Sequence, residues 1–258
     1  MLTAAVNGID IAYADSGGDG PPVVLSHGYL MDNSMFDGQL PALVPEFRVI
    51  TWDERGFGGT PAPGPFSYWD SARDVLGLLD HLAIDSAVLG GMSQGGFLSL
   101  RAALLAPDRV RALILLDSQA GQEDPAHLDG YEQMEVAWQA HGPAPVQEAV
   151  ASVILGPGDW SGWYARWALL DNEGLRHSFR CLLDRDDITG RLGEITCPAL
   201  VVHGTADIAI PMSRAQELRD GLGGKASLVA VEGGPHAANL THPAEVNAAI
   251  LEFLHGLS

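Results

Sequence analysis

The chain has 258 residues, of which 47% are hydrophobic, so it is long enough for one α/β domain with a small insertion. Its 14 basic and 33 acidic residues give a formal net charge of −19, which repels nucleic acids and anionic lipid surfaces. We therefore expect no nucleic-acid or membrane partner. The first residues do not have the pattern of a signal peptide and no apolar run is long enough to span a membrane, so we expect a cytoplasmic protein.

Short apolar runs alternate with amphipathic segments along most of the chain. Asn7-Gly8, between runs at 4–6 and 9–13, predicts a β-hairpin because this dipeptide tolerates the positive φ angles of a type I′ turn. The runs that follow are almost entirely apolar, which is typical of parallel strands covered on both faces. They lie at residues 23–26, 48–52, 87–91, 113–117, 199–203 and 227–231.

This alternation predicts an α/β fold with a mostly parallel, doubly wound sheet and helices on both faces. The alternation stops between Leu116 and Pro198, where helical patterns replace the strands. An insertion there lies over the carboxyl edge of the sheet, where ligands bind in open α/β folds. We predict a helical cap at residues 121–195, inserted after the sixth strand into a core formed by residues 1–120 and 196–258.

One pentapeptide carries a chemical signal. Gly91-x-Ser93-x-Gly95 lies between an apolar strand and an amphipathic helix, as in the nucleophile elbow that exposes a serine Oγ above a parallel sheet. Small residues flank such a serine because its backbone is strained and its neighbours pack closely against it. The pattern predicts Ser93 as a nucleophile.

A serine hydroxyl needs a base to take its proton, and the base needs an acid to orient it. His236 follows the last apolar strand and precedes the last helix, so we predict it as the base, with His242 as the alternative. Asp207 follows a buried strand and a flexible Gly204, so we predict it as the acid. Asp117, which also ends a strand, is the alternative acid.

Cleavage of an ester also needs hydrogen-bond donors for the developing oxyanion. The backbone N–H of Gln94 lies at the start of the helix after Ser93 and is one expected donor. The backbone N–H of Tyr29, in the loop after the strand at 23–26, is the other. We interpret Asp53 and Arg55 as a structural ion pair.

Together these segments resemble the α/β-hydrolase superfamily over nearly the whole chain. The resemblance implies acyl transfer, in which an acyl-enzyme forms on Ser93 and water activated by His236 releases the acid. Within the superfamily the chain looks like the small bacterial esterases, enol-lactonases, acyl-homoserine lactonases and cofactor-free haloperoxidases or perhydrolases. The matching segments are His27-Gly28, Asp53-x-Arg55-Gly56-x-Gly58, Gly91-x-Ser93-x-Gly95-Gly96, Gly204-x-x-Asp207-x-x-x-Pro211 and His236.

Two departures narrow the resemblance. Serine at position 93 replaces the aspartate of haloalkane dehalogenases and epoxide hydrolases, and Gln94 stands where proline iminopeptidases have tryptophan. The histidine and cysteine spacings match no metal site and no dinucleotide fingerprint follows a strand, so we expect no cofactor and no metal.

The cap is rich in tryptophan. Its aromatic residues are interpreted either as a helix stripe packed on the domain or as an aromatic wall for an apolar acyl or lactone substituent. On the second interpretation the substrate pocket is formed by Trp138, Trp160, Trp163 and Trp167.

The leading hypothesis is a serine hydrolase of small to medium carboxylic esters or lactones. A perhydrolase or cofactor-free haloperoxidase with the same three residues is the alternative, and a non-catalytic ligand-binding protein of the same fold is the third hypothesis. We expect a small-molecule ester or lactone as partner and either a monomer or a homodimer.

Overall fold

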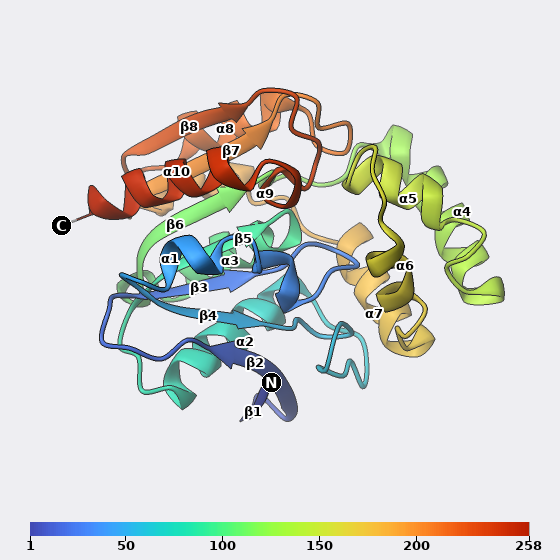
Figure 1. The fold of residues 1–258 in the computed structure, drawn as a ribbon, viewed down its shortest axis with the longest axis horizontal. Helices are drawn as coiled ribbons and strands as arrows, with labels where there is room; N and C mark the ends of the chain where they lie inside the picture. The colour runs from blue at the N-terminus through green and yellow to red at the C-terminus, as the bar shows by residue number, and fades with distance from the viewer. Residues whose placement is uncertain (258) are drawn as a thin grey trace.

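The computed structural model describes residues 1–257. An eight-stranded sheet forms the centre of the molecule, with strand order β1-β2-β4-β3-β5-β6-β7-β8 (Figure 1). The strands β3 to β8 are parallel, whereas β1 and β2 pair antiparallel with each other and β2 pairs antiparallel with β4. The strands are β1 (Leu2–Val6), β2 (Ile9–Asp15), β3 (Pro22–Ser26), β4 (Arg48–Trp52), β5 (Ala87–Met92), β6 (Val110–Leu116), β7 (Ala199–Gly204) and β8 (Ala226–Val231).

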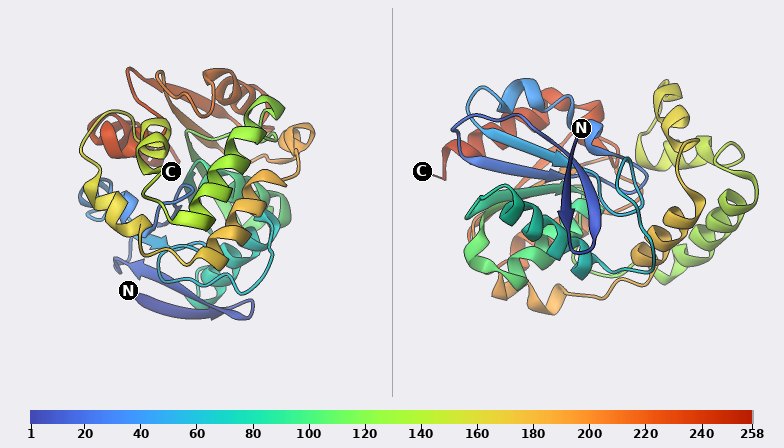
Figure 2. Two further views of the ribbon diagram at one scale, coloured as in Figure 1. Left: turned by 90° about the vertical axis from the view of Figure 1, so that its right-hand side faces the viewer. Right: turned by 90° about the horizontal axis from the view of Figure 1, so that it is seen from below.

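Helices cover both faces of the sheet. In the right-hand view of Figure 2, α1 and α10 lie on one side and α2, α3 and α8 on the other. The core helices are α1 (Leu40–Leu43), α2 (Tyr68–His81), α3 (Gln94–Leu105), α8 (Met212–Gly221), α9 (Ala238–Thr241) and α10 (Pro243–His255). Short 3₁₀ helices are η1 (Asn33–Phe36), η2 (Pro107–Arg109) and η3 (Thr189–Glu194).

Four helices between β6 and β7 form a layer beside the carboxyl ends of the strands (Figure 1). They lie within the predicted cap at 121–195, and the two boundaries of that cap stay a prediction. The cap helices are α4 (Pro125–His141), α5 (Gln147–Ile154), α6 (Ser161–Trp167) and α7 (Asn172–Leu183).

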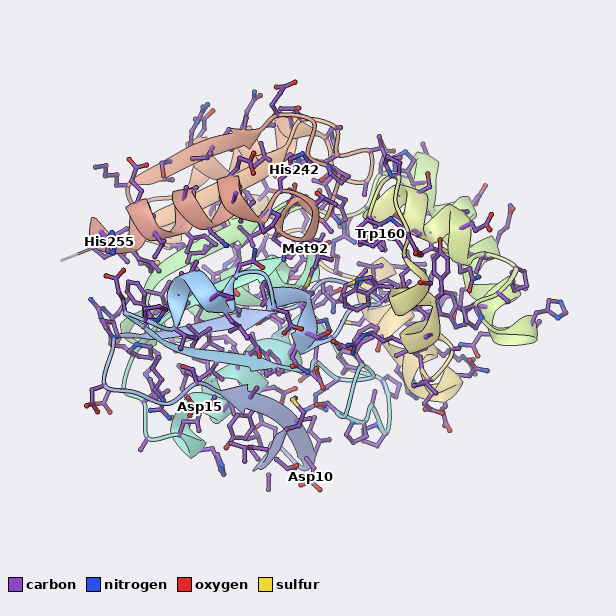
Figure 3. The ribbon with its side chains drawn as sticks, viewed as in Figure 1. Asp10, Asp15, Met92, Trp160, His242 and His255 are labelled. Atoms are coloured by element: carbon purple, nitrogen blue, oxygen red, sulfur yellow. The ribbon has the colours of Figure 1, made fainter. Side chains whose placement is uncertain are left out.

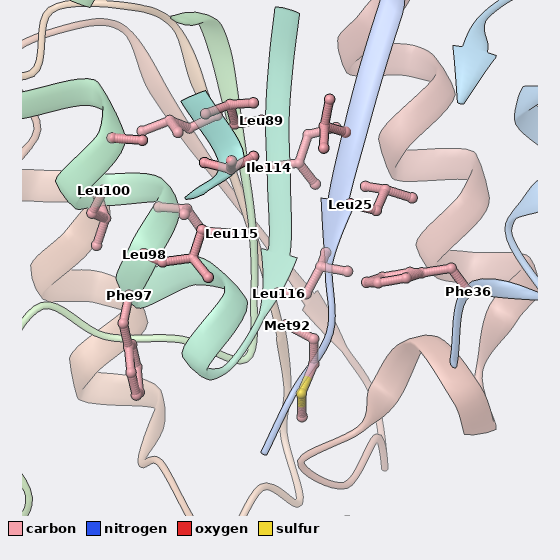
Figure 4. Packing of buried hydrophobic residues seen from close by; sticks show 14 of the residues in the cluster. Leu25, Phe36, Leu89, Met92, Phe97, Leu98, Leu100, Ile114, Leu115 and Leu116 are labelled. Atoms are coloured by element: carbon pink, nitrogen blue, oxygen red, sulfur yellow. The ribbon is translucent and has the colours of Figure 1, made fainter. Parts of the chain in front are cut away.

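The hydrophobic core lies between the central strands and their helices (Figure 4). Leu25 on β3 and Ile114 on β6 are fully buried on either side of Gly90, where a Cβ atom would lie 2.8 Å from the Leu25 side chain. Gly90 therefore lets the neighbouring strands fill the space over β5 with their own side chains. The resulting packing fixes the end of β5, where Ser93 follows.

The predicted fold class is confirmed. All the predicted strands are present, because nearly continuous apolar runs are the pattern that burial on both faces requires. The predicted hairpin turns at Asn7 and Gly8, which have φ angles of 49° and 80°. In residues 1–257 no helix combines the length and apolar character needed to cross a membrane. The cytoplasmic location stays a prediction.

Candidate active site

Ser93 occupies a strained turn between β5 and α3. Its φ of 51° and ψ of −112° lie outside the regions that most L-residues adopt. Gly91 and Gly95 pack directly against each other across this turn, since a Cβ on Gly91 would lie 2.2 Å from the Gly95 carbonyl carbon. Hydrogen bonds from Ser93 N to Leu116 O and from Ser118 Oγ to Ser93 O, both 2.8 Å, hold the strained residue in place.

Substituting Gly95 with alanine is expected to destabilise the protein by at least about 3 kcal/mol, because the backbone cannot yield. The added Cβ would lie 2.0 Å from the Ser26 carbonyl oxygen. Urea unfolding measures the change. Gly162→Ala is the matched control, because a Cβ at this α6 position meets nothing within 4 Å and alanine favours a helix by about 0.5–1 kcal/mol. Equal stability of the two variants would contradict the tight elbow.

The structure brings Ser93, His236 and Asp207 together. His236 Nδ1 lies 2.8 Å from Asp207 Oδ2, and His236 Nε2 lies 3.0 Å from Ser93 Oγ. Because a carboxylate only accepts, His236 Nδ1 carries the proton of the first hydrogen bond. His236 Nε2 then has a free lone pair and accepts the hydrogen bond from the Ser93 hydroxyl. The alternative base, His242, instead lies at 2.8 Å from the hydroxyl of Thr241.

Asp207 is held by its own loop. Its Oδ1 accepts hydrogen bonds from the backbone N–H groups of Ala209 (2.8 Å) and Ile210 (2.9 Å). Burial alone would raise the pKa of Asp207, but the charge and hydrogen bond of His236 outweigh it and leave that pKa below its ordinary value. Asp207 is therefore poised as an anion beside the imidazole.

A second histidine lies behind Asp207. His203 Nε2 is 2.8 Å from the Ile210 carbonyl oxygen, which can only accept, so this nitrogen carries a proton. The same N–H faces Asp207 Oδ2 at 3.4 Å. The sequence analysis did not select His203 as a site residue, but the structure places it against the carboxylate that also contacts His236. Because His203 lies on β7 and Asp207 lies in the loop that follows, their spacing in the sequence does not signal this contact.

Asp117, the alternative acid, is fully buried at the end of β6 and does not contact His236. Its Oδ1 accepts the N–H of Gly204 at 2.7 Å, and its Oδ2 has no hydrogen-bond partner. Burial and the negative charge of Asp207 raise its pKa well above the ordinary value. Ligand atoms of Asp117, His203 and Asp207 lie within 4.8 Å of one another.

The two predicted oxyanion donors are free to act. Across residues 1–257, the backbone N–H groups of Tyr29 and Gln94 have no hydrogen-bond acceptor in the protein. Gln94 is the first residue of α3, where helix geometry leaves the N–H unpaired. The loop that carries Tyr29 is fixed by the cap, since Trp167 Nε1 donates a 2.7 Å hydrogen bond to the Leu30 carbonyl oxygen.

A cavity of about 590 Å³ opens beside Ser93 and His236, under the cap. One wall comes from α5 and is apolar, whereas polar groups gather where β6 leads into α4. The sequence analysis did not identify the apolar wall or the polar groups, because neither set of residues forms a motif. The α5 wall contains Val146, Ala149, Val150, Val153 and Ile154, and the polar groups are Glu123, His127 and Tyr131.

The tryptophans lie elsewhere in the cap: the lining residues of the cavity within 1–257 include none of Trp138, Trp160, Trp163 and Trp167. Trp138 and Trp167 are buried against each other with ring centroids 6.1 Å apart. Trp160, at the side of the cap that faces the core in Figure 3, donates a hydrogen bond to the Gly156 carbonyl oxygen. Trp163 lies under the guanidinium of Arg166. This arrangement corrects the aromatic-wall interpretation, because the indoles pack within the cap and on the Leu30 loop.

The predicted ion pair between Asp53 and Arg55 is wrong. Arg55 Nη2 donates a 2.9 Å hydrogen bond to Asp74 on α2, whose side chain is fully buried. Asp53 instead accepts hydrogen bonds from the backbone N–H groups of Asn33 (2.8 Å) and Gly59 (2.9 Å). Both residues are structural, as expected, but each has a partner that is distant in the sequence.

Comparisons with known proteins match this chain over most of its length. A family model described as alpha/beta hydrolase fold matches residues 21–144, and a model described as TAP-like protein matches residues 184–257. A protein of Variovorax paradoxus named carbamate hydrolase RutD is 33% identical over 93% of this chain and 94% of its own length.

Two solved structures are also similar. An esterase from Thermogutta terrifontis superimposes with a TM-score of 0.90 at 27% identity, covering 99% of this chain and 98% of its own. The enol-lactonase from Burkholderia xenovorans LB400 has a TM-score of 0.90 at 28% identity, covering 98% of this chain and 100% of its own.

Proposed function

Because the chain belongs to the α/β-hydrolase family, we propose that it hydrolyses carboxylic esters or lactones through an acyl-enzyme on Ser93. The observation that carries the proposal is the series of hydrogen bonds from Ser93 Oγ through His236 to Asp207, beside a mostly apolar cavity that Ser93 and His236 line. A residue in strained backbone geometry at such a place is typical of a nucleophile.

In the proposed reaction, His236 Nε2 takes the proton of Ser93 Oγ as the oxygen attacks the substrate carbonyl carbon. The bond from the carbonyl carbon to the alcohol oxygen then breaks, and His236 gives its proton to the departing alkoxide. Water repeats the sequence on the acyl-enzyme and releases the acid. The Asp207 carboxylate stabilises the imidazolium that forms in each half of the reaction.

The developing negative charge needs donors placed before the reaction begins. The unpaired N–H groups of Tyr29 and Gln94 fit this requirement, and the helix dipole of α3 adds to the attraction at Gln94. Charge that forms on the carbonyl oxygen would thus be stabilised by backbone groups held by the strand ends and by the contact of Trp167 with the loop.

The cavity supports esters or lactones of small to medium size. The cavity volume of about 590 Å³ is much larger than the volume of carbamate, an ion about the size of acetate, and the cavity lining is mostly apolar. A small anion would leave most of this apolar space empty. The cavity therefore favours the activities in the names of the esterase and the lactonase over that of the carbamate hydrolase.

The testing experiment is hydrolysis of p-nitrophenyl esters with acyl chains of increasing length, together with several lactones. We expect robust turnover with an optimum at medium chain length, since the α5 wall offers apolar contact to an acyl chain but the cavity volume is limited to about 590 Å³. Release of p-nitrophenol measures the first series and acid production the second.

Peroxide assays separate the other hypotheses. Formation of peracetic acid from acetate and hydrogen peroxide that exceeds ester turnover would replace the proposal with a perhydrolase that uses the same three residues. Tight binding of esters without any turnover would favour a ligand-binding protein.

A further inference from the structure

Glu123 places a carboxylate in the wall of the cavity. It lies in the segment between β6 and α4, and its side chain is only 9% exposed. Three N–H groups approach it, all at long distances: Arg185 Nη2 (3.3 Å), the backbone N–H of Asp124 (3.3 Å) and His127 Nδ1 (3.4 Å). An ionised carboxylate offers about four acceptor sites, so Glu123 retains capacity for a further donor.

Arg185 balances the charge of Glu123 from outside the cavity. Its side chain is 1% exposed, and its Nε and Nη1 groups donate to the carbonyl oxygens of Gly121 (3.1 Å) and Leu182 (2.7 Å). Its guanidinium lies 4.7 Å from the ring centroid of Phe97. All three nitrogens of Arg185 thus donate to protein acceptors, and Arg185 does not line the cavity, whereas Glu123 does.

Tyr131, one helix turn along α4 from His127, adds a second polar group to the cavity wall. Its hydroxyl has no hydrogen-bond partner among residues 1–257, and burial together with the charge of Glu123 raises its pKa to about 12. The phenol therefore keeps its proton at neutral pH and can accept or donate a hydrogen bond. Glu123 and Tyr131, which we call the polar pole, contrast with the apolar wall on α5.

The polar pole and the apolar wall on α5 favour different substrate groups. Apolar substrate atoms gain by contact with α5, but a carboxylate brought to the polar pole would meet the like charge of Glu123. A substrate group without a hydrogen-bond donor would leave the polar pole without this further hydrogen bond. A hydroxyl or ammonium group satisfies it.

We propose that Glu123 determines substrate specificity: it accepts a hydrogen bond from a hydroxyl or ammonium group that the ester or lactone carries beyond an apolar body. This inference rests on the proposed function. It assigns the enzyme to esters and lactones with a polar donor at the end remote from the scissile bond, and it disfavours substrates with a remote carboxylate.

Rigid aromatic esters test the proposal, because they cannot cyclise. Methyl benzoates and phenyl acetates with a para hydroxymethyl, ethyl or carboxyl group present the same body with the ester in either orientation. In one of these two ester orientations, kcat/KM for the hydroxymethyl ester is expected to exceed that for the ethyl ester by about tenfold and that for the carboxyl ester by about 100-fold. Glu123→Gln, which can donate to a carboxylate, should lower the hydroxymethyl-to-carboxyl ratio by at least about tenfold.

Matched variants separate specificity from folding. Asp129→Asn removes an exposed negative charge on α4, and Asp129 does not line the cavity, so this variant should leave the ratio unchanged. Tyr131→Phe should lower the hydroxymethyl-to-ethyl ratio by several fold, because it removes the second hydrogen-bonding group of the polar pole. If Glu123→Gln fails to fold, the wild-type preference among the three esters still tests the proposal.

An unchanged hydroxymethyl-to-carboxyl ratio in Glu123→Gln, or a wild-type preference for the carboxyl or ethyl ester, would overturn the specificity proposal. Failure of the proposed function gives a different result, in which no ester is hydrolysed or hydrolysis persists in Ser93→Ala.

Discussion

Replacing Ser93 with alanine is expected to reduce ester hydrolysis by about 10⁴- to 10⁶-fold, because the nucleophile and its base act as a unit. The variant keeps the backbone contacts that hold the elbow, since both Ser93 N and Ser93 O bond to the protein through the main chain. Initial rates of p-nitrophenyl ester hydrolysis measure the loss. Any residual rate above the uncatalysed reaction would come from the backbone donors and from binding.

Ser99, on the helix that follows Ser93, offers a control. Its buried Oγ donates a 2.7 Å hydrogen bond to the Gly95 carbonyl oxygen and does not line the cavity, so Ser99→Ala should keep activity within a few-fold. Intact mass after treatment with an arylsulfonyl fluoride provides a second readout, because wild type should gain one adduct and Ser93→Ala none. Undiminished turnover in Ser93→Ala would rule out the acyl-enzyme.

The central sheet could be predicted because its signal is local. Each buried strand is a short apolar run, and the elbow needs glycine on both sides of one serine, so both are visible within a few residues. The short strand-flanking helix α8 was not predicted in detail, because it buries only Ala215 and Leu218 and leaves a weak periodic pattern.

The cavity wall could not be predicted, because it depends on which neighbour a helix face meets. Helical spacing showed that Trp160, Trp163 and Trp167 share one stretch of the cap, but not that this stretch packs on the Leu30 loop. The partner of Arg55 could not be predicted for the same reason, since only the packing of α2 brings Asp74 next to Arg55. Glu123 lies in no sequence motif, and only its burial beside Arg185 in the structure identifies it as a candidate specificity residue.

Asparagine at position 207 is expected to lower kcat by about 10³- to 10⁴-fold, whereas asparagine at position 117 should keep kcat within a few-fold. In Asp207→Asn, the amide oxygen can still accept from Ala209 and Ile210, which turns the amide nitrogen toward His236. That N–H would favour the tautomer with the proton on His236 Nε2, which cannot take the proton of Ser93. Single-turnover kinetics with a p-nitrophenyl ester measures the effect.

Asp117→Asn is the matched variant because it makes the same chemical change on a buried neighbour. The amide oxygen can still accept the N–H of Gly204, so the loop before Asp207 keeps its shape. Full activity in Asp207→Asn, with loss in Asp117→Asn, would transfer the role of the acid to Asp117.

The Asp117 variant also has an expected effect on stability with a definite sign. Burial first, and the charge of Asp207 second, raise the pKa of Asp117, so the folded state favours its protonated form. The stability of wild type is then fully present below the ordinary pKa of an aspartate and falls as the pH rises through the folded pKa. Asparagine cannot lose a proton. In urea unfolding, Asp117→Asn should therefore gain free energy of unfolding relative to wild type between acidic and neutral pH, and a constant difference would show that Asp117 ionises freely.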